Sequence, residues 1–237
     1  MNNTDQKVKE IKQSFRQMMD GATAQSMRDK GMDYHLNWGA TIPRLREMAD
    51  ELRAEAGGLP GGQADLAAPS PLTFLSIGLW KENVRECKIL ATMLMPPTSM
   101  APELADLWME QTPTLEIAEQ AAFNLYQHLP YAADKAFEWL ASPLDLPQVC
   151  GYHVFSRLFM RSVELNERGI NEFLDQAVTA LQGCASDKGQ GGTAAPRGYG
   201  VALQKAAMQA VVHFAGTSIM HRRLAASAFR GTGLDFL

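Results

Sequence analysis

Apolar side chains recur at intervals of three and four residues along almost the whole chain. Near the start, Ile11, Phe15 and Met18 follow this spacing, and Val178 and Leu181 repeat it later. With 3.6 residues per turn, side chains spaced in this way share one face of an α-helix. No segment shows the clear alternation of polar and apolar residues that is typical of a strand. The pattern therefore predicts an all-α protein.

Proline and hydroxyl side chains mark where the predicted helices begin and end. Ser70-Pro71 and Thr112-Pro113 each place a capping hydroxyl before a proline in the first helical turn, whereas Met95-Pro96-Pro97 ends a helix. These signals divide the periodic segments into twelve helices, at about residues 4–20, 22–32, 41–56, 71–80, 83–95, 101–111, 114–129, 131–141, 146–162, 168–184, 199–215 and 217–230.

The lengths of these helices and of their connections favour a repeat architecture. Pairs of helices that recur every 30 to 40 residues or so are typical of HEAT-like helical hairpins stacked into a curved α-solenoid, and a compact helical bundle is the alternative. We expect residues 1–237 to form a single domain, with Gly-rich loops near 57–70 and 183–200.

The composition is that of a folded domain in a reducing compartment. The chain has 237 residues, 46% of them hydrophobic, which is enough to bury a core. No apolar run approaches the length of about 20 residues that spans a bilayer, and the first residues are polar, so we expect a cytoplasmic protein without membrane contact. Cys87, Cys150 and Cys184 have neither a zinc-site spacing nor a disulfide framework, which favours buried thiols. The sequence indicates no metal and no cofactor.

Charge is distributed unevenly along the chain. Residues 1–56 carry nine basic and nine acidic side chains, residues 57–145 carry four and eleven, and residues 146–237 carry nine and six. No Lys or Arg lies between Lys88 and Lys135. Any nucleic acid must therefore be held by the flanking segments rather than by this acidic middle.

Four motifs in a fixed order resemble those of a known family. They are Met27–Gly31, Trp38–Arg46, Leu79–Glu86 and Glu116–Gln120. In this order they are similar to the DNA alkylation repair family, and the resemblance runs from about residue 25 to residue 215. The resemblance implies a HEAT-like repeat fold whose concave surface holds duplex DNA, and an activity that excises alkylated purine bases.

The resemblance also implies a catalytic carboxylate. The aspartate of active family members corresponds to Glu119, where a negative charge can stabilise the sugar cation that forms as a base departs. Leu115 stands where the family has a tryptophan one turn earlier, and Gln209 replaces a second tryptophan late in the chain. Glu119 is therefore either a catalytic residue or a solvated helix acid.

Several further residues are candidates for the lining of the groove. Glu116 shares a helix face with Glu119, and Trp38 lies in a loop-like segment with neighbouring polar residues. Tyr152 and His153 are adjacent on a predicted helix and belong either to the groove or to the core. The groove-lining candidates are Glu116, Tyr152, His153, Gln209 and Trp38.

The DNA-binding candidates lie in the last third of the chain. Arg222 and Arg223 form a local basic cluster, and Arg197 and Lys205 can add phosphate contacts. Two arginines near a helix end can equally well compensate the helix dipole.

Two functions remain open at this point. The first is a DNA alkylation repair protein that binds duplex DNA and excises alkylated purine bases. The second is a noncatalytic helical-repeat module that binds a protein or another structured nucleic acid. A duplex-binding groove needs several Lys or Arg residues, so the charge of the concave face separates the two functions.

Overall fold

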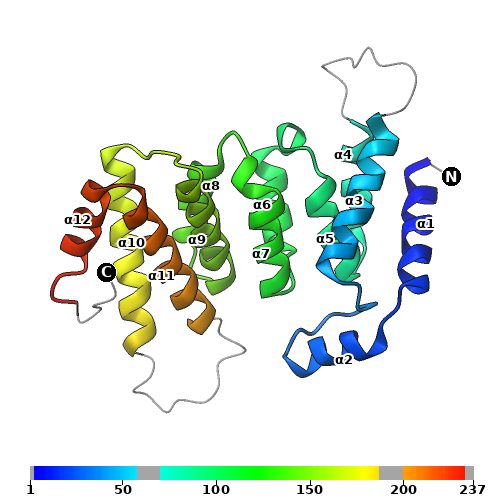
Figure 1. Cartoon of the computed structure of the whole chain (residues 1–237), viewed down its shortest axis with the longest axis horizontal. Helices are drawn as coiled ribbons and strands as arrows, with labels where there is room; N and C mark the ends of the chain where they lie inside the picture. Colours follow the sequence, from blue (N-terminus) through cyan, green and yellow to red (C-terminus); the bar gives the residue numbers. More distant parts are fainter. Residues whose placement is uncertain (1–2, 58–69, 187–199, 233–237) are drawn as a thin grey trace. The chain divides into compact units, whose positions relative to one another are not determined.

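The chain folds into helices only, in the part that the structure describes (Figure 1). The computed structural model describes residues 3–57, 70–186 and 200–232. The α-helices are α1 (Asn3–Gln17), α2 (Gly21–Asp29), α3 (Ile42–Gly57), α4 (Pro71–Lys81), α5 (Arg85–Leu94), α6 (Pro102–Glu110), α7 (Leu115–Asn124), α8 (Ala132–Leu140), α9 (Asp145–Met160), α10 (Glu167–Ser186), α11 (Gly200–Thr217) and α12 (Ile219–Ala228). Two short 3-10 helices, η1 (Pro97–Ser99) and η2 (Tyr126–His128), complete the set. The prediction of an all-α protein is confirmed.

One of the two predicted hydroxyl caps is confirmed. The Ser70 side chain accepts a hydrogen bond from the Leu72 amide at the start of α4. The prediction for Thr112-Pro113 is wrong by two residues: the Thr112 hydroxyl donates to the Trp108 carbonyl of α6, and Thr114 caps α7. The segment predicted as one helix over 114–129 is instead α7 followed by η2, because Leu125 leaves the helical region with φ −127 and ψ −62. In the predicted Gly-rich loops, residues 58–69 and 187–199 lie outside the described residues, and α10 continues to Ser186.

The chain divides into two compact units, Met1–Pro130 and Tyr131–Leu237. A single domain over residues 1–237 stays a prediction, and each unit is described by itself below.

In the first unit, α5 is the central helix and packs against α3, α4 and α7. Every residue of α5 is buried, including the charged residues Arg85, Glu86 and Lys88. Trp80 of α4 stacks on Trp108 of α6 with ring centroids 4.2 Å apart, and the Lys88 ammonium lies 4.4 Å from the Trp80 centroid. A helix that is buried on all sides must find partners for its charges within the protein.

In the second unit, α9 packs between α8 and α11. Gly151 permits the close approach of α8, because a Cβ atom there would lie 2.9 Å from the carbonyl oxygen of Ala136. Phe173 lies at the centre of an aromatic core, with ring centroids 5.3 Å from Phe155 and 5.0 Å from Phe159.

The buried-thiol prediction applies to two of the three cysteines. Cys87 and Cys150 are buried thiols, whereas the side chain of Cys184 lies outside the described residues. Burial raises the pKa of the Cys87 thiol to about 12, so this group stays protonated at neutral pH.

Candidate nucleic-acid interface

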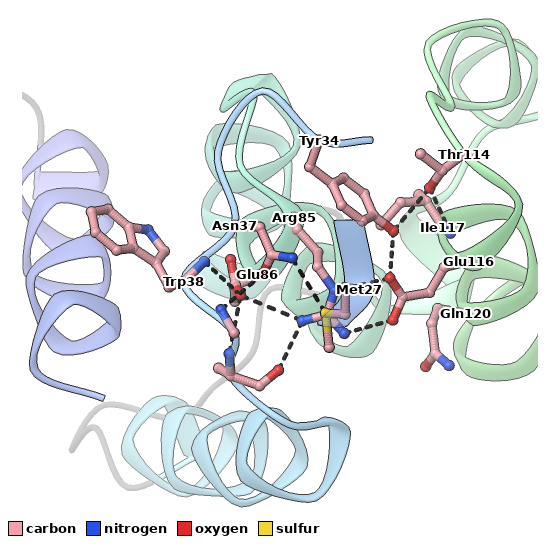
Figure 2. Close-up of polar contacts among 12 residues, drawn as sticks. Met27, Tyr34, Asn37, Trp38, Arg85, Glu86, Thr114, Glu116, Ile117 and Gln120 are labelled. Atoms are coloured by element: carbon pink, nitrogen blue, oxygen red, sulfur yellow. Dashed lines mark hydrogen bonds and ion pairs between the residues drawn. The ribbon is translucent and has the colours of Figure 1, made fainter. Parts of the chain in front are cut away.

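A buried ion pair joins α5 to α7 in the first unit (Figure 2). The Arg85 guanidinium donates from Nε to Glu116 Oε2 at 2.9 Å and from one terminal nitrogen to Glu116 Oε1 at 2.5 Å. The Arg85 side chain is 1% exposed and that of Glu116 is 15% exposed. Burial by itself lowers the pKa of Arg85, but the hydrogen bonds and charge of Glu116 outweigh it and raise the pKa overall. Two parallel hydrogen bonds of this kind are the strong, geometrically specific form of an ion pair.

A tyrosine completes the contacts of Glu116. The Tyr34 hydroxyl donates a short hydrogen bond to Glu116 Oε2 and accepts one of 2.9 Å from Thr114. Burial, followed by the negative charge of Glu116, raises the pKa of Tyr34 far above its usual value, so the phenol stays protonated. Both oxygens of the Glu116 carboxylate are therefore engaged within the protein.

The one acidic residue of α5, Glu86, holds the segment between α2 and α3. Glu86 Oε1 accepts hydrogen bonds from the backbone amides of Trp38 at 3.1 Å and Ala40 at 3.2 Å. Arg85 adds a hydrogen bond of 2.8 Å to the Ala40 carbonyl. Gly39 is required there, since its φ is +78 and a Cβ atom would lie 2.2 Å from the Asp20 carbonyl oxygen. The buried charges of α5 thus fix residues 38–40 against the helices.

Trp38 connects this segment to α1. Its ring is half-buried beside α1 (Figure 2), and the Arg16 guanidinium carbon lies 5.6 Å from the ring centroid. Its indole Nε1 is buried and has no hydrogen-bond partner among the described residues. The placement of Trp38 as a groove-lining residue stays a prediction.

A basic face runs along α1. Lys9, Lys12 and Arg16, with Gln13 and Gln17, line a surface depression of about 520 Å³. At spacings of three and four residues these side chains share one face of the helix. Lys12 forms an ion pair of 2.7 Å with Glu82, while Lys9 and Arg16 are exposed. Among the described residues, the lining of the depression contains three cations and no carboxylate, so it suits an anionic partner such as a phosphate backbone.

Glu119 lies one turn after Glu116 on α7 and is half-buried. Leu115 precedes it where the resemblance expects an aromatic side chain, and it is also half-buried. Its neighbour Glu116 is the carboxylate paired with Arg85 at 2.5 Å.

The remaining groove candidates lie in the second unit. Tyr152 is 1% exposed and its ring packs against Phe173, while His153 is 9% exposed. Such burial places both side chains in the core of the unit rather than on an open surface. Gln209 is exposed on α11.

The predicted DNA-binding residues of the second unit are on its surface where they are described. Lys205 of α11 and Arg222 and Arg223 of α12 are exposed. Arg197 lies outside the described residues. Their role as phosphate contacts stays a prediction.

Within the described ranges, no three His, Cys, Asp or Glu side chains gather in a way that could hold a metal ion. None of the helices found there has the length and apolar character needed to cross a bilayer.

The basic face of α1 was not predicted from the sequence. Residues 1–56 as a whole carry nine basic and nine acidic side chains, and this balance hides the helical spacing of Lys9, Lys12 and Arg16. That spacing was the available signal. Nothing in the sequence marks Tyr34 as a partner of Glu116, because 82 residues separate the two.

Comparison with known proteins supports the fold. The sequence matches no protein-family model and no curated protein. The structure is similar to a solved structure from a new family of proteins related to the HEAT-like repeat DNA glycosylases, with affinity for branched DNA structures. The two share 13% sequence identity and a TM-score of 0.69, over 95% of this chain and 83% of the other. This protein therefore has a HEAT-like helical-repeat fold, and the predicted fold class is confirmed.

Proposed function

We propose that this protein binds DNA, with branched DNA as its preferred form, and releases no base from it. The observation that carries the proposal is the basic face of α1, whose described lining holds Lys9, Lys12 and Arg16 without a carboxylate. The affinity for branched DNA described for the structural neighbour makes branched DNA the form to test first. Of the DNA alkylation repair function that the sequence motifs imply, the proposal retains DNA recognition and leaves out base excision.

The absence of base excision is inferred from the surroundings of α7. Glu116 cannot approach a sugar cation while both its oxygens are bound to Arg85 and Tyr34. Glu119 has the charge for this task, but Leu115, one turn before it, supplies no aromatic surface against which a damaged nucleotide could be held. A carboxylate without substrate positioning provides little catalysis.

Binding is tested by fluorescence anisotropy with a four-way junction, a duplex and a single strand of matched length. We expect the junction to bind most tightly. Three phosphate contacts from α1 should weaken the affinity about fortyfold between roughly 50 and 200 mM salt, and six contacts about a thousandfold. Equal affinity for all three DNAs would remove the preference for branches, and binding that is absent or insensitive to salt would refute the proposal.

Base release is tested on duplex DNA that carries 3-methyladenine or 7-methylguanine. Wild-type protein should release neither base. If release occurs, Glu119→Gln distinguishes its source, because losing an electrostatic contact to the transition state lowers a rate by about a hundredfold. Release that Glu119→Gln abolishes would restore the glycosylase function with Glu119 as its catalytic residue.

A further inference from the structure

A separate pocket of about 260 Å³ lies within the second unit, where the end of α9 meets the junction of α11 and α12. Phe159 and Phe214, both nearly fully buried, supply apolar lining, and their ring centroids are 5.2 Å apart. The His221 ring stacks on Phe214 at 4.5 Å with an interplanar angle of 24°. The volume is slightly below the range of about 300 to 1,000 Å³ that holds drug-sized ligands, so a single planar ring system is a suitable occupant.

One wall of the pocket contains a serine in a conformation that favours glycine. Ser162 has φ 57, and α9 ends there with hydrogen bonds from the Ser162 amide to the Phe159 carbonyl and from the Val163 amide to the Leu158 carbonyl, both of 2.9 Å. A helix that ends in this way commonly has glycine at the left-handed position, because a Cβ atom is disfavoured there. Ser162 keeps a side chain at this cost and is among the residues that line the pocket.

Polar groups complete the lining of the pocket. The Thr217 hydroxyl donates to the Phe214 carbonyl at 2.7 Å, and its oxygen lies 2.6 Å from His221 Nδ1. When the Thr217 proton is donated to the carbonyl, the imidazole donates from Nδ1, and Nε2 of the neutral ring is then a hydrogen-bond acceptor. Glu164, another residue with acceptor oxygens, is also in the lining.

Two arginines are next in sequence to residues that line this pocket. Arg161 directly precedes Ser162 and is exposed, and Arg222 follows His221 on α12, one helical turn beyond the lining residue Ser218. Aromatic lining, acceptors for N–H groups and nearby cations correspond to the three parts of a nucleotide: a flat base, its amino edge and its phosphates.

We propose that this pocket receives one unstacked, amino-bearing nucleobase, such as an adenine left unpaired at a DNA branch point. This inference rests on the proposed DNA binding and specifies what the second unit recognises. The base is held next to Phe214 and His221, and its N–H groups are directed at the acceptors of the pocket. A duplex offers no such base without the cost of unstacking it, so the pocket favours branched over continuous DNA.

The test uses a three-way junction with a dye at a distant end and either an unpaired adenine or an abasic residue at the branch point. Val163→Trp fills the pocket from a position where the native side chain is 37% exposed. Val212→Trp on α11 is the matched control, since Val212 is 47% exposed and is not among the residues that line the pocket. His221→Phe keeps an aromatic ring beside Phe214 and removes the acceptor. Circular dichroism and melting temperature establish that each variant is folded.

Wild-type protein and Val212→Trp should bind the adenine junction about tenfold more tightly than the abasic junction, which is the lower part of the range for stacking one base. Val163→Trp should bind both junctions equally, at the affinity of wild type for the abasic one, and His221→Phe should retain only part of the preference. The proposal for the pocket would be overturned if wild type and Val163→Trp preferred the adenine junction equally, or if wild type showed no preference. Either result would leave the proposed DNA binding intact. No binding of either junction by wild type would defeat both proposals.

Discussion

Arg85 of α5 and Arg16 of α1 lie in the same unit and have opposite surroundings. Arg85 is 1% exposed and has its partner carboxylate at 2.5 Å, whereas Arg16 is exposed beside a depression whose described lining holds no acid. The first arrangement is complete within the protein, since each hydrogen-bonding group of the ion pair contacts another part of the fold. The second leaves positive potential at the surface, where a polyanion can use it.

This difference separates stability from recognition. A buried ion pair contributes little compared with apolar packing, but removing one partner leaves the other charge unsatisfied and is costly. Exposed cations contribute little to folding and can be changed with small effects on stability. The two regions should therefore respond oppositely when charges are removed.

The largest effect is expected at the buried pair. Glu116→Gln leaves the Arg85 guanidinium without its main counter-charge and should lower the free energy of unfolding by about 3 to 5 kcal/mol. Urea denaturation measures this change. Glu110→Gln, at an exposed position of α6, is the control and should change stability by no more than about 0.5 kcal/mol. Similar effects in both variants would mean that the ion pair is not enclosed as described.

The next effect concerns DNA affinity. The double variant Lys9→Gln with Arg16→Gln should lower junction affinity about tenfold and reduce the dependence of log affinity on log salt by about 1.8, with little loss of stability. The matched control is Lys7→Gln with Arg44→Gln, which removes two cations already paired with Glu55 and Glu47. If the control weakens binding equally, net charge rather than the face of α1 holds the DNA.

A smaller effect is expected at Tyr34. Tyr34→Phe removes one hydrogen bond to the Glu116 carboxylate and one from Thr114 and should cost about 1 to 2 kcal/mol of stability, while DNA affinity stays unchanged. Urea denaturation tests the expected loss of stability, and fluorescence anisotropy on the same preparation tests the unchanged DNA affinity. A selective loss of DNA binding would place Tyr34 in the interface instead of in the buried network.

The smallest effect comes from a group of intermediate exposure. His213 of α11 shares a hydrogen bond of 2.7 Å with Ser156, and burial, followed by the charge of Arg157, lowers its pKa below 6.5. The unfolded chain then binds more protons than the folded one just below pH 6.5, so stability falls as the pH decreases through this window. Melting temperature should therefore drop slightly more for wild type than for His213→Asn between about pH 7.5 and 5.5. Parallel profiles would contradict this assignment.

The candidate site shows how far local patterns reach. The helix that carries Glu116 and Glu119 could be placed from its threonine cap and its apolar spacing, because these signals act within a few residues. The hydrogen bonds that occupy both oxygens of Glu116 could not be predicted in this way. They come from Arg85, 31 residues earlier, and from Tyr34, 82 residues earlier. The burial of Tyr152 was equally hidden, since an aromatic residue next to a histidine has the same local pattern in a core and in a groove.

By itself, the sequence determined the all-α class and the approximate positions of the helices, since backbone hydrogen bonds and the 3.6-residue period are local properties. Tertiary structure alone decided which charges are satisfied internally and which face solvent, because that depends on packing between distant segments. Arg85 and Arg16 are the same amino acid with the same intrinsic charge. Their surroundings make Arg85 part of a buried ion pair and Arg16 a candidate contact for DNA. The reason is that desolvation and counter-charge set the free energy of a charge in a protein.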